Sequence, residues 1–275
     1  MPEADYLRLT ALRLGDALIG QPLIRAELRW PNISSHNLVG RQLIGSASYG
    51  KHLLLRFDDH RTLHVHLRME GLFRLVRTST PAAVGRGHDI RAILATESWT
   101  ALGKELGMLD LLNTNDEKRL LERLGPEILA PDFWDNGAKV AVQKLGNYRN
   151  WPICAVLLEQ TVVAGIGTIW LAESLWVQQI YPWTIVSDLT TTQQLDLFRS
   201  AHRQLVRAVA IGRNQTLGAV PRRVHGQHKR FCVRCETTPI KVSALSGPDR
   251  SPDQGAFDRV VFWCPTCQQQ PKAGR

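Results

Sequence analysis

The sequence lacks any apolar run as long as the roughly 18 residues that a membrane-spanning helix requires. Its start, Met1-Pro2-Glu3-Ala4-Asp5, contains two acids and no basic stretch, unlike a secretory signal peptide. Cysteine is scarce, with 5 in 275 residues, and without a signal peptide this usage fits a reducing cytoplasm. We therefore expect a cytoplasmic protein with no role in a membrane.

Acidic residues are outnumbered by basic ones. Lys and Arg number 34 against 25 Asp and Glu, which gives a net charge of +9 and an isoelectric point of about 9.7. A balance this basic indicates an anionic partner, most commonly nucleic acid, although a generically basic soluble protein is the alternative. With 44% hydrophobic residues, the chain can bury a substantial core in two or three domains.

Four of the five cysteines form two pairs near the end of the chain, Cys232-x-x-Cys235 and Cys264-x-x-Cys267. Each pair places two thiolates on one tight turn, and two such turns can close a tetrahedral shell around Zn²⁺. Four thiolates leave no open position on the metal, so we expect one structural zinc. Two disulfides are the alternative. The remaining Cys154 lies in an apolar run and is predicted to be a buried thiol without chemistry.

The apolar pattern changes along the chain. Residues 23–112 form short segments rich in branched side chains, including a predicted hairpin of 52–57 with 61–67, which is typical of an antiparallel sandwich or barrel. The region that follows is mainly helical. Spacing and stop signals predict helices at 5–18, 116–124, 153–160, 169–177 and 191–211, ribbon strands at 240–242 and 260–263, and a loose tail at 268–275.

A glycine turn, Gly165-Ile166-Gly167-Thr168, separates two of the apolar helices. Its glycines permit positive φ and close approach of another backbone. The helix that begins near Thr168 would direct its first N–H groups outward, which makes an anion site. Such a turn can hold one DNA phosphate without reading sequence, although most G-x-G turns between helices only serve packing.

The start of the chain carries a possible nucleophile. An initiator Met before Pro is usually removed, which would leave Pro2 as a secondary amine at the chain end. An α-amino group has a pKa near 7.7–8.0, so it is partly neutral at pH 7 and can attack a carbon centre. The product is an iminium that acts as an electron sink, and Glu3 could move protons beside it. The alternative is an ordinary chain start.

Taken in order, these pieces resemble the formamidopyrimidine-DNA glycosylase and endonuclease VIII family of bifunctional base-excision enzymes. The resemblance covers nearly the whole chain, and its specificity comes from the order and spacing of several modest motifs. These motifs are Met1-Pro2-Glu3, Tyr49 to Leu54, His66-Leu67-Arg68-Met69-Glu70-Gly71, Leu124-Gly125-Pro126-Glu127, Gln160 to Trp176, and the ribbon from Cys232 to Cys267.

The resemblance implies an α+β multidomain fold. Residues 1–129 would form an N-terminal antiparallel β-sandwich with flanking helices, residues 130–226 a helix–two-turn–helix domain, and residues 227–275 a C-terminal β-hairpin zinc finger with a tail. It also implies a monomer that acts on damaged duplex DNA in the bacterial cytoplasm, at the nucleoid. Such enzymes flip the damaged base out of the duplex, because its glycosidic bond is otherwise inaccessible.

The family's catalytic roles map onto matching residues of this sequence. Pro2 would attack C1′ of the nucleotide, and Glu3 would protonate the opened sugar. The Schiff base would then drive β- and δ-elimination, which nicks the strand. Lys51 would contact phosphate beside the lesion and support proton transfer, and Met69 would fill the gap left by the flipped base. Without the resemblance, these would be a surface lysine and a core methionine.

The second half of the chain carries the remaining family positions. Arg259 matches the finger-tip arginine that grips phosphate, and Gly167 with Thr168 match the phosphate-holding turn. Thr168 stands where the family usually has Asn and offers less reach. Ala4 and Tyr6 depart from the usual start, which has an acid at position 6, although Asp5 lies between them.

Residues 101–107 stand where the oxidised-purine branch carries an Asp-Pro-Arg-Arg-Phe-Gly loop with two further wedge residues. The absence of this loop favours the endonuclease VIII branch and oxidised pyrimidines. Three alternatives remain: a catalytically weak or inactive damaged-DNA-binding protein on the same scaffold, an oxidised-purine glycosylase, and a zinc-ribbon protein that binds RNA or protein.

Overall fold

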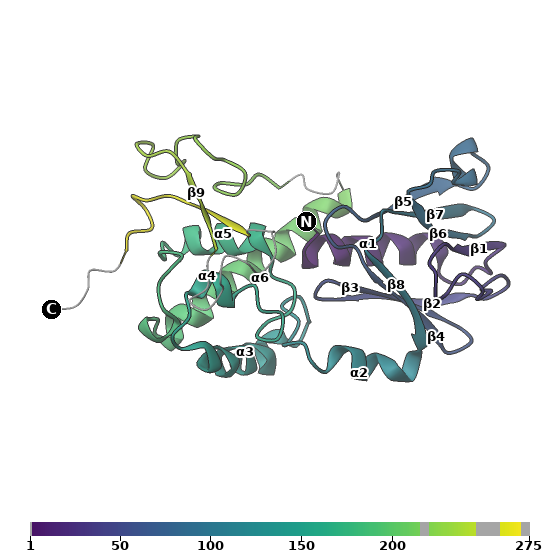
Figure 1. Ribbon diagram of the computed structural model, residues 1–275, viewed down its shortest axis with the longest axis horizontal. Helices are drawn as coiled ribbons and strands as arrows, with labels where there is room; N and C mark the ends of the chain where they lie inside the picture. The colour runs from purple at the N-terminus through teal and green to yellow at the C-terminus, as the bar shows by residue number, and fades with distance from the viewer. Residues whose placement is uncertain (1, 215–219, 246–258, 271–275) are drawn as a thin grey trace. The chain divides into compact units, whose positions relative to one another are not determined.

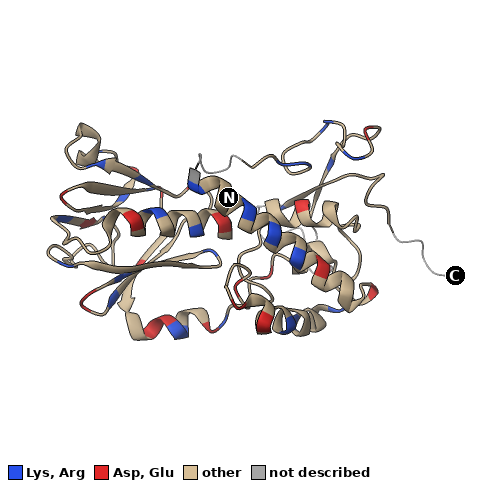
Figure 2. Cartoon of the chain, turned by 180° about the vertical axis from the view of Figure 1, so that it is seen from behind, with Lys and Arg blue, Asp and Glu red and all other residues tan. Residues whose placement is uncertain are grey.

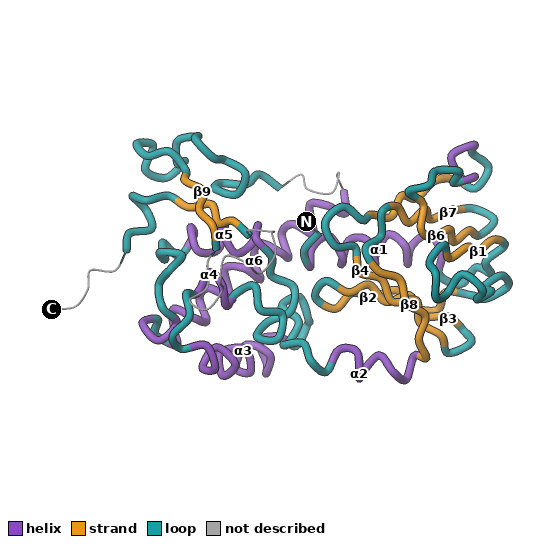
Figure 3. The backbone as a smooth tube through the Cα atoms, in the orientation of Figure 1, coloured by secondary structure: helices purple, strands orange, loops and turns teal. Residues whose placement is uncertain are grey.

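The computed structural model describes residues 2–214, 220–245 and 259–270. The chain divides into two compact units, residues 1–123 and 124–275 (Figure 1). Strands dominate the first unit, whereas the second contains most of the helices (Figure 3). Within the described residues, no helix combines the length and the apolar character that crossing a membrane requires.

The first unit contains two four-stranded antiparallel sheets, ordered β2-β3-β4-β8 and β1-β6-β7-β5. The predicted sandwich is confirmed. The first sheet consists of β2 (Leu43–Tyr49), β3 (His52–Phe57), β4 (Arg61–His66) and β8 (Met108–Asn113). The second sheet consists of β1 (Arg25–Leu28), β5 (Leu72–Arg77), β6 (Ile90–Ala95) and β7 (Trp99–Lys104).

The core of this unit lies between the sheets and under one helix. The register pairs Leu53 with Val65 and Leu55 with Leu63, so these buried side chains share one face. Helix α1 (Ala4–Leu18) matches the helix predicted at 5–18 and packs against β2. Its apolar residues recur every three or four positions and join the same core: Leu7, Ala11, Leu14 and Leu18. The core thereby fixes where the chain start lies on this unit.

The second unit contains four helices and the finger ribbon within the described residues. The helices are α3 (Ala138–Leu145), α4 (Ile153–Val156), α5 (Thr168–Val177) and α6 (Thr191–Asn214). The ribbon pairs β9 (Lys241–Ala244) with β10 (Val260–Trp263) in antiparallel register. The first unit ends with a short helix, α2 (Glu117–Leu121).

Helix α4 is much shorter than the helix predicted at 153–160. After Val156 the backbone tightens, because Leu158 and Glu159 bond to carbonyls only three residues back. Helix α6 is three residues longer than predicted, whereas α2 covers only part of the predicted 116–124. Each difference lies at a helix end, where sequence signals are weakest.

Candidate functional site

The chain start leads directly into helix α1. Pro2 is partly buried, and Glu3 is the N-cap residue, with φ −118° and ψ −176°. The carbonyl of Glu3 accepts the N–H of Leu7 at 3.1 Å, so this residue begins the helix. Its side chain is only 1% exposed, which is rare for a carboxylate and marks Glu3 as a candidate functional group.

The two departures from the family's start have structural consequences. Ala4 is fully buried at the first position of α1. Tyr6 packs against the core of the first unit, and its burial raises the pKa of the phenol. Neither side chain is an acid, and Asp5 lies between the two positions.

Lys51 lies in the turn of the β2–β3 hairpin. Tyr49 pairs with His52, so Gly50 and Lys51 form a two-residue connection. Gly50 has φ +55°, a conformation that glycine adopts without steric cost and that matches the twist of a tight hairpin. The turn thereby places the lysine at the end of a well-ordered pair of strands.

Met69 lies in the loop between β4 and β5 and is 58% exposed, so it is not the core methionine of the alternative interpretation. The loop is fixed at both ends. His66 Nδ1 accepts the N–H of Arg68 at 3.0 Å, and Gly71 N–H donates to the Leu67 carbonyl at 3.0 Å. A Cβ at Gly71 would lie 2.4 Å from that carbonyl oxygen, so a larger residue would distort the loop.

The connection between β7 and β8 contains only residues 105–107. Its central residue, Leu106, is 3% exposed and belongs to the core. Gly107 lies against Arg68, because a Cβ there would be 2.3 Å from the arginine Cγ. This connection therefore provides no extended loop of wedge residues.

In the second unit, the glycine turn precedes α5 as predicted. Gly165 has φ +112°, and Gly167 is the N-cap residue of the helix that begins at Thr168. One side chain that sequence reasoning missed, Gln160, stabilises this turn. Its oxygen accepts the Gly165 N–H at 2.9 Å, and its amide donates to the Ile166 carbonyl at 2.9 Å. Only its polarity within an apolar stretch hinted at this role.

The Leu124-Gly125-Pro126-Glu127 motif is hydrogen-bonded to the chain just before the same turn. Gly125 N–H donates to the Gln160 carbonyl at 2.8 Å, and Ala164 N–H donates to the Pro126 carbonyl at 3.0 Å. A Cβ at Gly125 would lie 2.4 Å from the backbone of Val162, so glycine is needed for this approach. The motif therefore supports the turn before α5 through the backbone.

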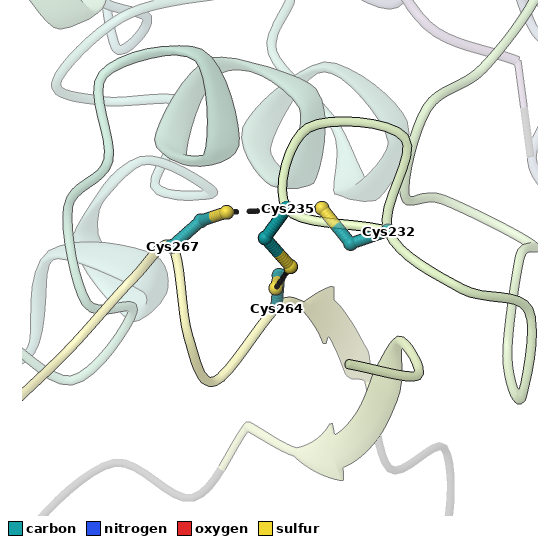
Figure 4. Close-up of side chains that lie close together, drawn as sticks. All are labelled: Cys232, Cys235, Cys264 and Cys267. Carbon is teal, nitrogen blue, oxygen red and sulfur yellow. Dashed lines mark hydrogen bonds between the residues drawn. The ribbon is translucent and has the colours of Figure 1, made fainter. Parts of the chain in front are cut away.

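The four finger cysteines converge from two turns, one before β9 and one after β10 (Figure 4). The Sγ atoms of Cys232 and Cys267 are 3.8 Å apart, and those of Cys235 and Cys264 are 3.7 Å apart. A disulfide would need about 2.05 Å, so the disulfide alternative is wrong. Four thiolates 2.3 Å from a tetrahedral zinc lie about 3.8 Å from one another, and the observed distances fit that geometry.

The thiols differ in how easily they ionise. Hydrogen bonds from Thr237 and its neighbours lower the pKa of Cys235 to about 6. Burial and the adjacent thiols raise the pKa of Cys267 to about 12. A bound cation is therefore needed to stabilise four thiolates at once. Cys154 is fully buried, and burial raises its pKa to about 12, as expected for an inert thiol.

Polar contacts attach the finger to helix α5 and the chain after it. Trp176 Nε1 donates to Cys232 Sγ at 3.3 Å. Arg234 donates to the Trp176 carbonyl at 2.7 Å and stacks on that indole, 4.0 Å from its centre. Gln268 is fully buried and donates to the Ile180 carbonyl at 2.9 Å. The predicted loose tail is therefore wrong at residue 268, while residues 271–275 lie outside the described part.

The segment that leads into the finger is also fixed to α5. The buried carboxylate of Glu173 accepts the backbone N–H groups of Arg223, Val224 and His225 at 2.9–3.1 Å. At the other end of the ribbon, Arg259 is exposed and its carbonyl accepts the N–H of Leu245 at 2.7 Å. Arg259 thus lies at the end of the ribbon opposite the cysteines.

Comparison with known protein families agrees with this geometry. Residues 1–111 match the formamidopyrimidine-DNA glycosylase N-terminal domain, and residues 124–218 match the formamidopyrimidine-DNA glycosylase H2TH domain. Both matches coincide closely with the sandwich and the helical region.

Curated relatives match along the whole chain. A probable endonuclease 8 2 of Streptomyces coelicolor is 35% identical over 98% of this chain and 95% of its own length. The DNA-(apurinic or apyrimidinic site) lyase Nei2 of Mycolicibacterium smegmatis is 31% identical over 98% and 99%. The formamidopyrimidine-DNA glycosylase of Lactococcus lactis is 27% identical over 98% and 100%.

Among solved structures, the Lactococcus lactis enzyme in complex with DNA containing an oxidised pyrimidine aligns with a TM-score of 0.80 and 26% identity. The alignment covers 98% of this chain and 100% of that one. Higher identity to the endonuclease 8 relatives, together with the short β7–β8 connection, supports the endonuclease VIII side. The chain belongs to the formamidopyrimidine-DNA glycosylase and endonuclease VIII family of DNA-repair glycosylases with AP-lyase activity, in its endonuclease VIII-like branch.

Proposed function

We propose that this protein excises oxidised pyrimidines from damaged duplex DNA and nicks the strand through a Schiff base on Pro2. The observation that carries the proposal is the chain start, where Pro2 precedes α1 beside the almost fully buried Glu3. The short β7–β8 connection supports the choice of pyrimidines. We further propose that the protein acts as a monomer on nucleoid DNA in the bacterial cytoplasm, in line with its bacterial relatives.

The chemistry follows from a neutral secondary amine. Once Met1 is removed, the nitrogen of Pro2 attacks C1′ of the flipped nucleotide, and the C1′–base bond breaks as the base leaves with a proton. The C1′–O4′ bond then breaks, O4′ takes a proton from Glu3, and the nitrogen lone pair forms the iminium. The iminium withdraws electrons from C2′, so loss of the C2′ proton expels the 3′ phosphate by β-elimination, and δ-elimination then expels the 5′ phosphate. Glu3 carries protons between these steps, and Lys51 neutralises phosphate beside the lesion.

Groups on both units bind the duplex in this proposal. Met69 fills the gap left by the flipped base, while Gly167, Thr168 and Arg259 contact phosphates. Lys and Arg are distributed over both units (Figure 2), and such charges bind DNA with a strong dependence on salt.

One structural zinc is proposed for the finger. The observed Sγ separations fit tetrahedral coordination by Cys232, Cys235, Cys264 and Cys267. When bound, the ion supplies folding energy to the finger rather than reactivity, since no coordination position stays open.

Borohydride trapping on an abasic duplex, preceded by intact-mass measurement of the purified protein, tests the proposal. We expect a mass without the initiator Met and a covalent adduct that runs as a protein–DNA band. Pro2→Gly should trap more weakly, and Glu3→Gln should slow turnover. A duplex panel containing oxidised pyrimidines and oxidised purines then identifies the lesion class.

A protein of confirmed mass that lacks Met1 and forms no adduct would refute the enzyme proposal. Full cleavage activity by a chain that retains Met1 would refute the role of Pro2, because an amide nitrogen is not nucleophilic. Faster excision of oxidised purines than of pyrimidines would reverse the choice of substrate.

A second candidate function is a damaged-DNA sensor with little or no catalysis. Buried Ala4 and core-packed Tyr6 favour it, because the acid that the family usually has at position 6 is replaced by Tyr6, and the second acid of the chain start is Asp5. This candidate predicts tight, salt-sensitive binding to an abasic duplex with no strand cleavage on any lesion.

A further inference from the structure

Three histidines lie together on the polar face of the β2-β3-β4-β8 sheet, next to the Gly50–Lys51 turn. His52 is the first residue of β3 and pairs with His66, and His64 lies two residues earlier on β4. Because paired residues share a face and side chains alternate along a strand, all three point to the same side of the sheet. This is the face opposite the hydrophobic core.

His52 is held by both of the other rings. Its Nδ1 lies 2.8 Å from Nε2 of His64, and its ring meets that of His66 edge-on with 5.4 Å between centres. His66 in turn accepts the backbone N–H of Arg68 through Nδ1. One set of contacts therefore links the residue after Lys51 to the loop that carries Met69.

The bond between His52 and His64 requires a neutral partner. One imidazole donates and the other accepts, so both cannot be protonated at once. His64 is 2% exposed, and its Nδ1 has no hydrogen-bond partner in the described part of the chain. Burial is the largest reason that the pKa of His52 falls to about 3 and that of His64 to about 4. The pair is therefore uncharged near pH 7.

Charged groups approach this cluster from four elements. Lys51 comes from the hairpin turn and Arg68 from the β4–β5 loop, while Asp110 comes from β8 and Glu117 from α2. A charged imidazole beside Lys51 would compete with it for a phosphate and repel its ammonium group. A neutral pair can fix the turn without adding charge.

We propose that His52 and His64 are positioning residues, which hold the Lys51 turn and the Met69 loop in one arrangement for the same damaged nucleotide. His64 is the buried anchor, and His52 transmits its position to both elements. The inference rests on the proposed roles of Lys51 and Met69. It assigns a task to two side chains that the proposed reaction steps do not use.

Single-turnover cleavage of an abasic duplex measures this effect. His64→Leu removes the bond to His52, and we expect the cleavage rate to fall about tenfold, because small misplacements of catalytic groups cost this much or more. The duplex dissociation constant should change less than twofold, because no charge is lost. His64→Gln keeps a polar group near the position of Nε2 and should restore most of the rate. His36→Gln, at an exposed histidine, is the control and should leave the rate unchanged.

Combination with Lys51→Gln and Met69→Ala separates positioning from general damage to the fold. If His64 acts by positioning Lys51 and Met69, adding His64→Leu to the Lys51→Gln/Met69→Ala variant should slow cleavage no further. Multiplied losses, or a wild-type rate for His64→Leu, would overturn the inference. Should His64→Leu unfold, His52→Leu at the partly buried end of the pair, with His52→Asn as its rescue, gives the same comparison.

The two proposals fail in different ways. If the wild-type protein forms no adduct, and Lys51→Gln leaves the cleavage rate unchanged, the proposed function is refuted. The positioning role is then refuted with it. Wild-type protein that traps DNA and depends on Lys51, but tolerates His64→Leu, refutes the positioning role alone.

Discussion

The polar face of the β2-β3-β4-β8 sheet in the first unit and the finger in the second unit are stabilised by different interactions. On the sheet, the Glu117 carboxylate accepts hydrogen bonds from Arg56 at 2.6–3.0 Å and from Thr62 at 2.6 Å, above a core of packed apolar side chains. In the finger, strands of four residues bury little apolar surface, and four thiols with contacts to α5 hold the ribbon. The sheet network should respond to acid, and the finger to removal of metal.

Loss of the proposed zinc should have the largest effect, and the unfolding that it causes should be confined to the finger. Cys264→Ser leaves three thiols, and a structural zinc contributes about 10–16 kcal/mol in isolated fingers. We expect the variant to lose the bound metal and to bind the duplex at least tenfold more weakly. The backbone amides around the cysteines should exchange hydrogen about as fast as those of an unfolded chain. Metal analysis and hydrogen exchange measure this. Cys154→Ala is the matched control. If Cys264→Ser still binds one metal ion tightly, four-thiolate coordination does not hold the finger together.

Acid should weaken the first unit through Glu117. Burial opposes its ionisation, but hydrogen bonds from Arg56 and Thr62 outweigh this and lower the pKa of Glu117. A lowered pKa in the folded state means that the stabilisation is present above the unfolded pKa and is lost as pH falls through the folded pKa. Glu117→Gln should cost about 2 kcal/mol of unfolding free energy at pH 7 and much less near pH 3.

Denaturant unfolding at both pH values measures that prediction. Asp116→Asn alters the exposed neighbouring acid and should change neither value noticeably. An equal loss at pH 7 and pH 3 would show that the carboxylate charge does not stabilise this face.

Arg234 should matter for attaching the finger but not for binding metal. Arg234 also donates to the Val177 carbonyl at 3.3 Å, and Arg234→Lys keeps the charge but loses this second hydrogen bond and the flat stacking on Trp176. We expect about 1–2 kcal/mol less protection of β9 and β10 amides, with metal content unchanged. Arg230→Lys, at an exposed residue four positions earlier, serves as control. Loss of metal from Arg234→Lys would mean that attachment and coordination are not separate.

Thr168→Asn should have the smallest effect. The amide reaches further than the hydroxyl and adds a donor at the start of α5, so duplex binding should tighten about twofold, or roughly 0.5 kcal/mol. Titration at two salt concentrations measures it, with Thr190→Asn in the loop before α6 as control. Weaker binding by Thr168→Asn would show that the turn relies on backbone groups alone.

Local patterns in the sequence were sufficient to predict several secondary-structure elements, the cysteine cluster and the family. The paired C-x-x-C spacing predicted a cluster whose Sγ distances fit tetrahedral coordination. The spacing of leucines predicted α1, and the two branched-residue segments at 52–57 and 61–67 predicted the β3–β4 hairpin. The order and spacing of the short motifs indicated the family without any tertiary information. All of these signals lie within a few residues of the feature that they specify.

Only the tertiary structure decided which distant polar groups meet. The bond between His52 and His64, the bracing of the glycine turn by Gln160, and the burial of Gln268 each depend on segments brought together by folding. Sequence spacing does not predict these contacts, because a hydrogen bond requires the donor and acceptor atoms to lie about 3 Å apart. Positions along the chain do not give that distance until the strands and helices have packed.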